Sequence, residues 1–128
     1  MLASGSDDKT IIVWDGLTFK KLTRVATPHE GNIFSVVWVP GSDDNLVASG
    51  AGDCRLALTD LETGQGLRSV LGHQGRVKRL TVSLDCPGLV WSGGEDGAVR
   101  QWDLREKWSA ENSNVLVNLN SQVGQLVF

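Results

Sequence analysis

The sequence lacks tyrosine altogether and holds only three prolines, two cysteines and one methionine in 128 residues. No apolar run is long enough to span a bilayer, and the chain turns polar within its first residues. We therefore expect neither a transmembrane segment nor a signal peptide. Cys54 and Cys86 stand apart without CxxC spacing. They predict reduced, buried thiols in an intracellular protein of the cytoplasm, the nucleus or both.

The sequence also lacks a strong excess of either positive or negative charge. Lys and Arg number 12 against 15 Asp and Glu, for a formal net charge of −3. This balance argues against a broad basic surface for nucleic acid or for an anionic membrane. Two histidines and two cysteines are scattered without the spacing of zinc ligands, and no glycine-rich phosphate loop is recognisable. The sequence predicts no metal and no other cofactor, and it leaves proteins as the expected partners.

Glycine and tryptophan, in contrast, are frequent, with 15 and five residues. The glycines predict many tight turns. Three segments, 2–15, 47–60 and 90–103, superimpose on one another. In each, a Ser is followed four residues later by Asp, ten residues later by Trp or Thr, and then by a closing Asp. The closing Asp, at 15, 60 and 103, recurs with the period of about 40–45 residues that is typical of propeller blades.

Short runs of apolar and β-branched residues, bounded by Gly, Asp, Asn or Pro, alternate with polar turns along the whole chain. No stretch keeps a helical period over two or three turns, so the predicted fold class is all-β. We expect strands near 2–5, 10–14, 19–26, 33–39, 46–50, 55–59, 66–71, 76–82, 89–93, 98–102 and 115–119.

These segments resemble the WD-repeat family, whose blades open with Gly-His and end with Trp-Asp. Gly72 and His73 fit fully, Pro28 and His29 fit with Pro in place of Gly, and Thr59 replaces the Trp of repeat two. The resemblance implies an incomplete β-propeller of about three blades with four antiparallel strands each, from a fragment or a truncated isoform. The expected domains are a partial repeat one at 1–27, repeat two at 28–71, repeat three at 72–119 and a stub of the next blade at 120–128.

The recurring polar residues predict a structural network in which Asp accepts from His, His meets Ser, and Ser meets Trp. His73, Ser92 and Asp96 have the composition of a hydrolase triad. A catalytic set occurs once, however, whereas this spacing recurs, so we expect no catalytic residue and no enzyme. The predicted network comprises Ser4, Asp8 and Trp14 in repeat one, His29, Ser49 and Asp53 in repeat two, and His73, Ser92, Asp96 and Trp102 in repeat three.

Four basic residues form a second candidate site around His73. One interpretation is a binding patch for an acidic or phosphorylated partner. The other is that these residues lie at the solvated end of a strand. Alternation along a strand places two of them on one face and favours the second interpretation. They are Arg68, Arg76, Lys78 and Arg79.

The tryptophans divide by position. Those at 14, 38, 91 and 102 lie on predicted strands and are expected in the core. Trp108 lies in a polar loop, where it either anchors a partner or folds back on the surface.

A narrower resemblance covers almost the whole chain. Residues 32–36, 76–79 and 103–106 resemble the early blades of WD-repeat proteins that also carry tetratricopeptide repeats. These proteins are similar to substrate receptors of the cullin-4 RING ubiquitin ligases. In such receptors a Trp-Asp-x-Arg string meets the adaptor called damaged-DNA-binding protein 1. The resemblance assigns this contact to Trp102, Asp103 and Arg105.

Two functions remain open at this point. The first is a protein-binding module of a substrate receptor, which docks on the ligase adaptor and presents a client protein. The alternative is a general scaffold that binds peptides in a chromatin or signalling complex. In that case Asp103 and Arg105 only brace the turn that follows their strand.

Overall fold

The computed structural model describes residues 2–6, 8–41, 45–105 and 114–118, the last range without its side chains. Every regular element in these ranges is a strand, which confirms the all-β fold class. None of the described residues forms a helix with the length and apolar character needed to cross a membrane. The strands are β1 Leu2–Gly5, β2 Thr10–Trp14, β3 Lys21–Ala26, β4 Ile33–Trp38, β5 Leu46–Ala51, β6 Arg55–Asp60, β7 Gln65–Leu71, β8 Val77–Ser83, β9 Cys86–Gly94, β10 Ala98–Asp103 and β11 Asn114–Asn118.

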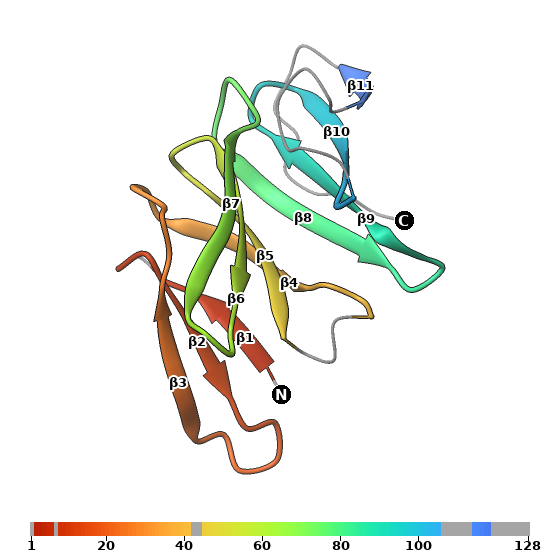
Figure 1. Cartoon of the computed structure of the whole chain (residues 1–128). Helices are drawn as coiled ribbons and strands as arrows, with labels where there is room; N and C mark the ends of the chain where they lie inside the picture. Colours follow the sequence, from red (N-terminus) through yellow and green to blue (C-terminus); the bar gives the residue numbers. More distant parts are fainter. Residues whose placement is uncertain (1, 7, 42–44, 106–113, 119–128) are drawn as a thin grey trace.

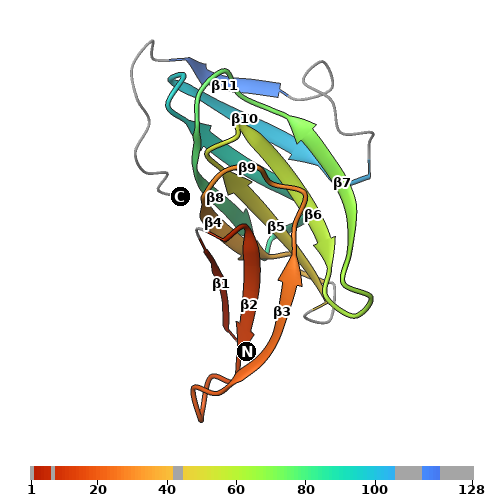
Figure 2. The same cartoon turned by 90° about the vertical axis from the view of Figure 1, so that its left-hand side faces the viewer.

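The strands form three antiparallel sheets, each from a continuous stretch of chain (Figure 1). The sheets are β1-β2-β3, β4-β5-β6-β7 and β8-β9-β10-β11, and we call them blades one, two and three. Their first strands lie next to one another, β1 beside β4 and β4 beside β8. Figure 2 shows the blades following one another in chain order. This is the arrangement of consecutive propeller blades.

The expected and observed strands agree closely, with two differences at hairpins. β3 begins at Lys21 rather than at 19, because Phe19 has a φ of 57° and belongs to the preceding turn. β9 begins at Cys86 rather than at 89, because the pairing continues to Ser83 opposite Cys86. Trp108 and the expected stub at 120–128 lie outside the described residues.

The β1–β2, β5–β6 and β9–β10 turns share one geometry. Lys9, Cys54 and Gly97 take φ values of 69°, 66° and 80° in these turns. The amide of each donates to the carbonyl three residues earlier at 3.2 Å. The residue before each of them is the recurring Asp, so all three turns present an aspartate in the same way.

The core lies between the blades. Ile11, Ile33 and Val47 are buried between blades one and two, and a larger cluster around Leu56 and Trp102 fills the space between blades two and three. Each blade therefore buries its face against the next blade.

The tryptophans and cysteines depart in part from their expected burial. Trp102 is 1% exposed, but Trp14, Trp38 and Trp91 are only half-buried. Trp91 Nε1 donates to Gln101 Oε1 on the neighbouring strand at 3.0 Å. The prediction that the Trp91 indole lies in the core is therefore wrong. The prediction of buried thiols is also wrong: both cysteines lie in or beside hairpin turns, with Cys54 half-buried and Cys86 exposed.

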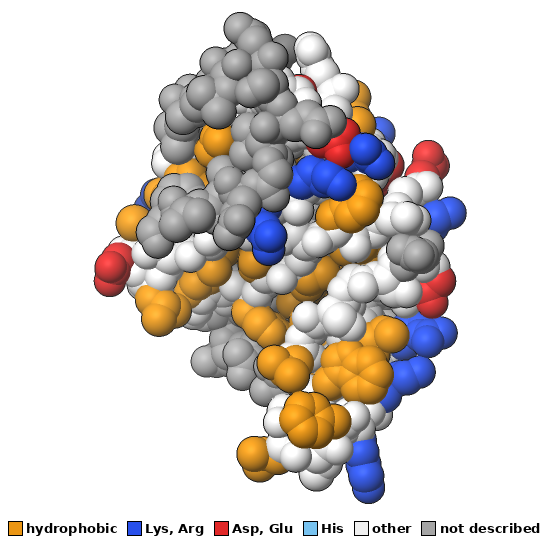
Figure 3. Space-filling view, turned by 180° about the vertical axis from the view of Figure 1, so that it is seen from behind, with side chains coloured by type: hydrophobic (Ala, Val, Ile, Leu, Met, Phe, Trp, Pro, Cys, Tyr) orange, Lys and Arg blue, Asp and Glu red, His pale blue; other side chains and the backbone are white. Residues whose placement is uncertain are grey.

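Exposed apolar side chains gather at the hairpin between β2 and β3. Leu17 and Phe19 are 92% and 72% exposed there, and Leu22 of β3 is 53% exposed. Figure 3 shows hydrophobic side chains clustered at this lower end of the molecule.

Substitution of Gly72 tests the packing between blades two and three. An added Cβ would lie 2.6 Å from Leu56 Cδ1 and 2.7 Å from Trp102 Cζ2, both buried. Gly72→Ala should therefore lower the free energy of unfolding by about 1–3 kcal/mol through overpacking. Urea denaturation measures this change in the free energy of unfolding. The control is Gly16→Ala, where no atom lies within 4 Å of the new Cβ and a change below about 0.5 kcal/mol is expected. Equal effects at the two positions would contradict this packing.

Candidate functional site

A chain of hydrogen bonds runs through the interior of blade three. Trp102 Nε1 donates to Ser92 Oγ at 2.8 Å. His73 Nε2 lies 2.8 Å from the same Oγ, and His73 Nδ1 lies 3.0 Å from Asp96 Oδ1. Every donor meets an acceptor if a neutral His73 carries its proton on Nδ1. The Ser92 hydroxyl then donates to Nε2, and Nδ1–H donates to Asp96. The structure thus brings all four expected residues of repeat three together.

Blade two repeats this chain without the tryptophan. His29 Nε2 lies 2.8 Å from Ser49 Oγ, and His29 Nδ1 lies 3.2 Å from both carboxylate oxygens of Asp53. Thr59 stands at the Trp position, fully buried, and its hydroxyl has no hydrogen-bond partner among the described residues. The His–Ser–Asp part of the network therefore forms without help from an indole.

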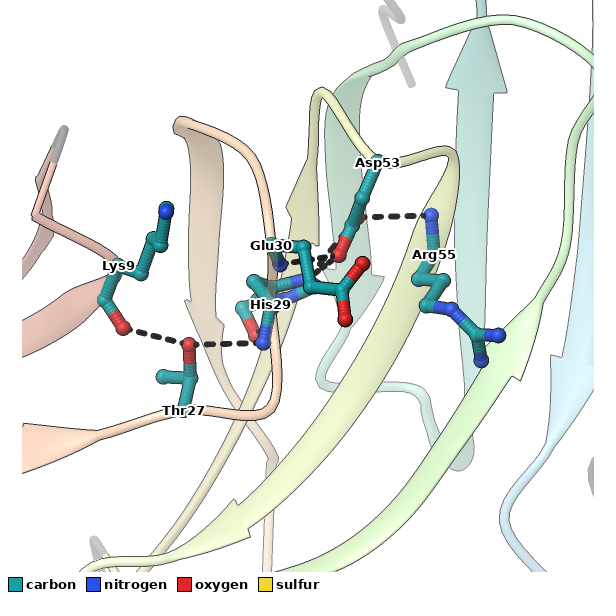
Figure 4. Close-up of polar contacts among 7 residues, drawn as sticks. Lys9, Thr27, His29, Glu30, Asp53 and Arg55 are labelled. Atoms are coloured by element: carbon teal, nitrogen blue, oxygen red, sulfur yellow. Dashed lines mark hydrogen bonds and ion pairs between the residues drawn. The ribbon is translucent and has the colours of Figure 1, made fainter.

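Each aspartate of the network also organises the backbone around it. Asp53 Oδ2 accepts from the Glu30 amide at 2.8 Å, and Oδ1 accepts from the Arg55 amide at 3.1 Å (Figure 4). Asp96 accepts from the two equivalent amides at 3.0 and 3.1 Å. One carboxylate thus joins the β-turn, the histidine ring and the segment that enters the blade.

Blade one contains only part of the expected set. Trp14 Nε1 donates to Ser4 Oγ at 2.9 Å, as in blade three. Asp8 accepts from the amide and hydroxyl of Thr10 at 3.1 and 2.6 Å, and it pairs with Arg24 at 3.7 Å. Asp8 is therefore a turn residue and is not joined to Ser4 or Trp14, because no histidine connects them.

Thr27 was not expected to take part. Its hydroxyl donates to the Lys9 carbonyl at 2.7 Å and accepts from the His29 amide at 3.3 Å (Figure 4). It therefore ties the β1–β2 turn of blade one to the start of blade two. No sequence signal marks this role, because one of the two partners is a backbone carbonyl 18 residues away.

Burial controls the charge of the network. His29 and His73 are each 4% exposed, and burial lowers the pKa of both rings below the ordinary 6.5, against the attraction of their aspartates. Burial acts to raise the pKa of Asp96, but hydrogen bonds from the Gln74 amide and the His73 ring outweigh it and lower that pKa. The rings are therefore neutral at pH 7 and the carboxylate is charged.

Ser92, His73 and Asp96 have the geometry of a hydrolase triad, but the Ser92 hydroxyl is buried. The Ser92 hydroxyl and His73 ring are within hydrogen-bond distance, but Ser92 is 0% exposed and its oxygen already accepts from Trp102. A nucleophile needs an open pocket with oxyanion donors beside it. Among the described residues, no three His, Cys, Asp or Glu side chains are grouped to hold a metal ion. This arrangement can stabilise a blade, and the Ser92 hydroxyl at its centre is not exposed.

The opposite end of each sheet carries a second recurring aspartate. In every repeat the closing Asp accepts, through Oδ1, from the amide two residues later. The pairs are Asp15 with Leu17 at 2.8 Å, Asp60 with Glu62 at 2.9 Å and Asp103 with Arg105 at 2.9 Å.

Arg105 distinguishes blade three from the other two. Its Nε and Nη2 donate to the two carboxylate oxygens of Asp103 at 3.0 and 2.9 Å, and these bonds lower the pKa of Asp103. The Arg105 side chain is nevertheless 80% exposed. Trp102, grouped with this pair from the sequence, is 1% exposed and offers no surface to a partner. The accessible part of the motif is therefore the Asp103–Arg105 pair.

Arg68 was wrongly grouped with the basic residues around His73. It lies opposite Leu58 in the middle of β7, and its Nη1 donates to the Leu104 carbonyl at 2.8 Å. This bond links blade two to the turn that carries Arg105. The sequence gives no sign of it, because the acceptor is backbone and lies 36 residues away.

Two stretches of the chain, residues 1–15 and 64–103, match the protein-family model described as "WD domain, G-beta repeat". The chain carries WD repeats. Such repeats typically form protein-interaction modules rather than active sites. The match leaves out residues 16–63 and 104–128, and the first of these stretches contains Thr59, which replaces the tryptophan of repeat two.

Three relatives extend the similarity beyond the repeat itself. The chain is 42% identical over 99% of its length to WD and tetratricopeptide repeats protein 1 of Homo sapiens. It is 38% identical over 94% of its length to Protein ALTERED SEED GERMINATION 2 of Arabidopsis thaliana. It is 32% identical over 91% of its length to DDB1- and CUL4-associated factor 6 of Mus musculus. The WD-repeat chain spans 18%, 18% and 14% of the length of these relatives.

Removal of an aspartate tests whether the network is structural. Asp96→Ala leaves the His73 ring and two backbone amides without their acceptor, which should lower the free energy of unfolding by about 1–3 kcal/mol. Ser92→Ala should act in the same direction but more mildly. The control is Asp85→Ala at an exposed hairpin residue, with a change below about 0.5 kcal/mol. Urea or thermal melts measure all three, and an Asp96→Ala melt identical to that of the parent would contradict the network.

Acid should destabilise the protein in the histidine range. Both folded-state pKa values lie below the 6.5 of an ordinary histidine, so the unfolded chain takes up protons first as the pH falls. Stability should be fully present well above pH 6.5 and should fall as the pH drops below 6.5, by up to about 1.4 kcal/mol per pH unit for each histidine. The chain has only these two histidines. His73→Asn should therefore halve the slope in denaturant melts, and a flat parent profile would refute the neutral-ring assignment.

Proposed function

We propose that this WD-repeat chain is part of a substrate receptor that docks on the adaptor of a cullin-4 RING ubiquitin ligase. The supporting observation is Arg105, which is exposed just after β10 in blade three and held by Asp103. The matching position is Leu17 in repeat one and Glu62 in repeat two. The name of one relative, DDB1- and CUL4-associated factor 6, adds an association with these ligase subunits. DDB1 is here the adaptor damaged-DNA-binding protein 1.

The pair suits a docking contact for a physical reason. A guanidinium presents a planar fork of donors that matches carboxylates and carbonyl oxygens on a partner. Asp103 holds the guanidinium by its Nε and Nη2 edge, so less side-chain entropy is lost on docking than for an unrestrained arginine. Arg68 holds the carbonyl of the residue before Arg105, which fixes the turn as well. Asp103 therefore preorganises Arg105 for an acceptor on the adaptor.

In this role the chain binds proteins and carries out no chemistry of its own. The partners are the adaptor and a client protein, in the intracellular location expected from the sequence. A general scaffold that binds peptides in chromatin or signalling complexes would use the same fold without Arg105. The two functions therefore differ in the consequence of changing this one side chain.

Arg105→Ala should abolish adaptor binding and leave the fold intact. An interfacial arginine can contribute about 2 kcal/mol or more, roughly thirtyfold in affinity. The side chain is 80% exposed, so its loss should cost the fold less than about 0.5 kcal/mol. Co-precipitation of damaged-DNA-binding protein 1 with the full-length protein measures binding, and melts measure the fold.

The matched control is Glu62→Ala, because Glu62 occupies the position of Arg105 in repeat two. It should retain the adaptor at the level of the parent. Equal recovery of the adaptor by Arg105→Ala and the parent, at equal stability, would reject docking through this motif. A scaffold function would then be the better account.

A further inference from the structure

Two neighbouring blades carry a β-bulge at the same position of their first strand. In β4 the register passes from Ile33 opposite Ala51 to Ser35 opposite Gly50, which leaves Phe34 as the extra residue. In β8 it passes from Val77 opposite Gly94 to Arg79 opposite Gly93, which leaves Lys78 as the extra residue. A bulge re-aims a side chain away from the alternation of its strand, and bulges are frequent beside functional sites.

The two bulged residues meet each other. Lys78 Nζ lies 4.1 Å from the centroid of the Phe34 ring, and Arg76 Cζ lies 5.9 Å from it. Glu95 Oε1 pairs with Arg76 Nη2 at 2.8 Å and with Lys78 Nζ at 3.3 Å. We call these four residues, together with the exposed Arg79 that follows Lys78, the bulge patch.

Arg76 and Lys78 share one face, as expected, but for a reason other than strand alternation. β8 begins at Val77, after Arg76, and the bulge at Lys78 interrupts the two-residue period. The first strands are also bonded to each other, because Ser35 Oγ accepts from the Leu80 amide at 3.0 Å. The bulge patch is therefore held across the junction of blades two and three.

The aromatic and basic side chains of the bulge patch are accessible to solvent, whereas its single acidic side chain, Glu95, is mostly covered. Phe34 is 39% exposed and the Arg76 and Lys78 side chains are 53% and 31% exposed, against 14% for Glu95. Asp96, the nearby acid of the turn, is committed to His73 and backbone amides. Two cations pair with one carboxylate, and the exposed Arg79 follows Lys78 in the strand. The bulge patch therefore carries net positive charge in a chain of net charge −3.

We propose that the bulge patch binds an acidic peptide segment of a partner protein. Carboxylates of such a segment complement Arg76, Lys78 and Arg79, with Phe34 as an apolar floor. A basic segment fits poorly, because Lys78 already occupies the cation position over the Phe34 ring. The bulge patch lies at the Val77–Gly94 end of blade three, whereas Asp103 pairs with Leu89 at the other end. The proposal therefore does not depend on adaptor docking by Arg105.

The test uses fluorescence anisotropy with the full chain and two labelled peptides, hexaglutamate and hexalysine. Hexaglutamate should bind, hexalysine should not, and raising the salt from about 50 mM to about 300 mM should weaken binding. Arg79→Glu should reduce the affinity for hexaglutamate by about tenfold or more, since it places a like charge beside the bound peptide. Lys78→Gln should reduce it less, since it removes a charge without reversing it.

The control is Lys20→Glu, which makes the same change of net charge at an exposed residue of the β2–β3 hairpin. It should leave hexaglutamate binding unchanged, and melts of every variant report on the fold. The proposal is overturned if the parent does not bind hexaglutamate, if hexalysine binds as tightly, or if Lys20→Glu loses as much affinity as Arg79→Glu. None of these outcomes affects the co-precipitation of the adaptor in the Arg105→Ala experiment. Failure of one proposal is therefore distinguishable from failure of the other.

Discussion

The part-buried hydrogen bond between an aspartate of a β-turn and a histidine of the preceding segment is the constraint on which the two four-stranded blades depend. Asp53 and Asp96 each accept from a histidine ring and from two backbone amides, so one carboxylate ties three pieces of chain together. A carboxylate that is largely removed from water is tolerated only when its acceptor sites are filled. Because the ring must be neutral for the serine hydroxyl to donate to it, the network also couples blade stability to pH.

This network accounts for the residues that look most like a catalytic set, and both proposed binding surfaces lie at the ends of the sheets. At one end of blade three, Asp103 holds an exposed Arg105 in place. At the other, bulges in β4 and β8 bring Phe34 and Lys78 together. The two surfaces differ in chemistry and are separated by the length of a strand, so a receptor could hold an adaptor and a client at the same time.

Blade two shows which parts of the repeat are essential for its geometry. Thr59 replaces the tryptophan, and its buried hydroxyl has no partner in the part of the chain that the structure describes. The histidine, serine and aspartate nevertheless keep the distances of blade three within a few tenths of an ångström. The indole therefore adds packing and one donor to a network that closes without it. In blade one the reverse holds, since Trp14 and Ser4 are bonded without any histidine.

The period of the closing Asp, the strand positions and the grouping of His73, Ser92 and Asp96 followed from the sequence alone, because repeats and strand alternation are local patterns that several copies reinforce. The tertiary structure decided what depends on how blades are placed beside one another. Arg68 reaches a backbone carbonyl 36 residues away, which no residue pattern encodes. Lys78 turns towards Phe34 only because a bulge, a property of strand register, breaks the alternation on which sequence reasoning relies.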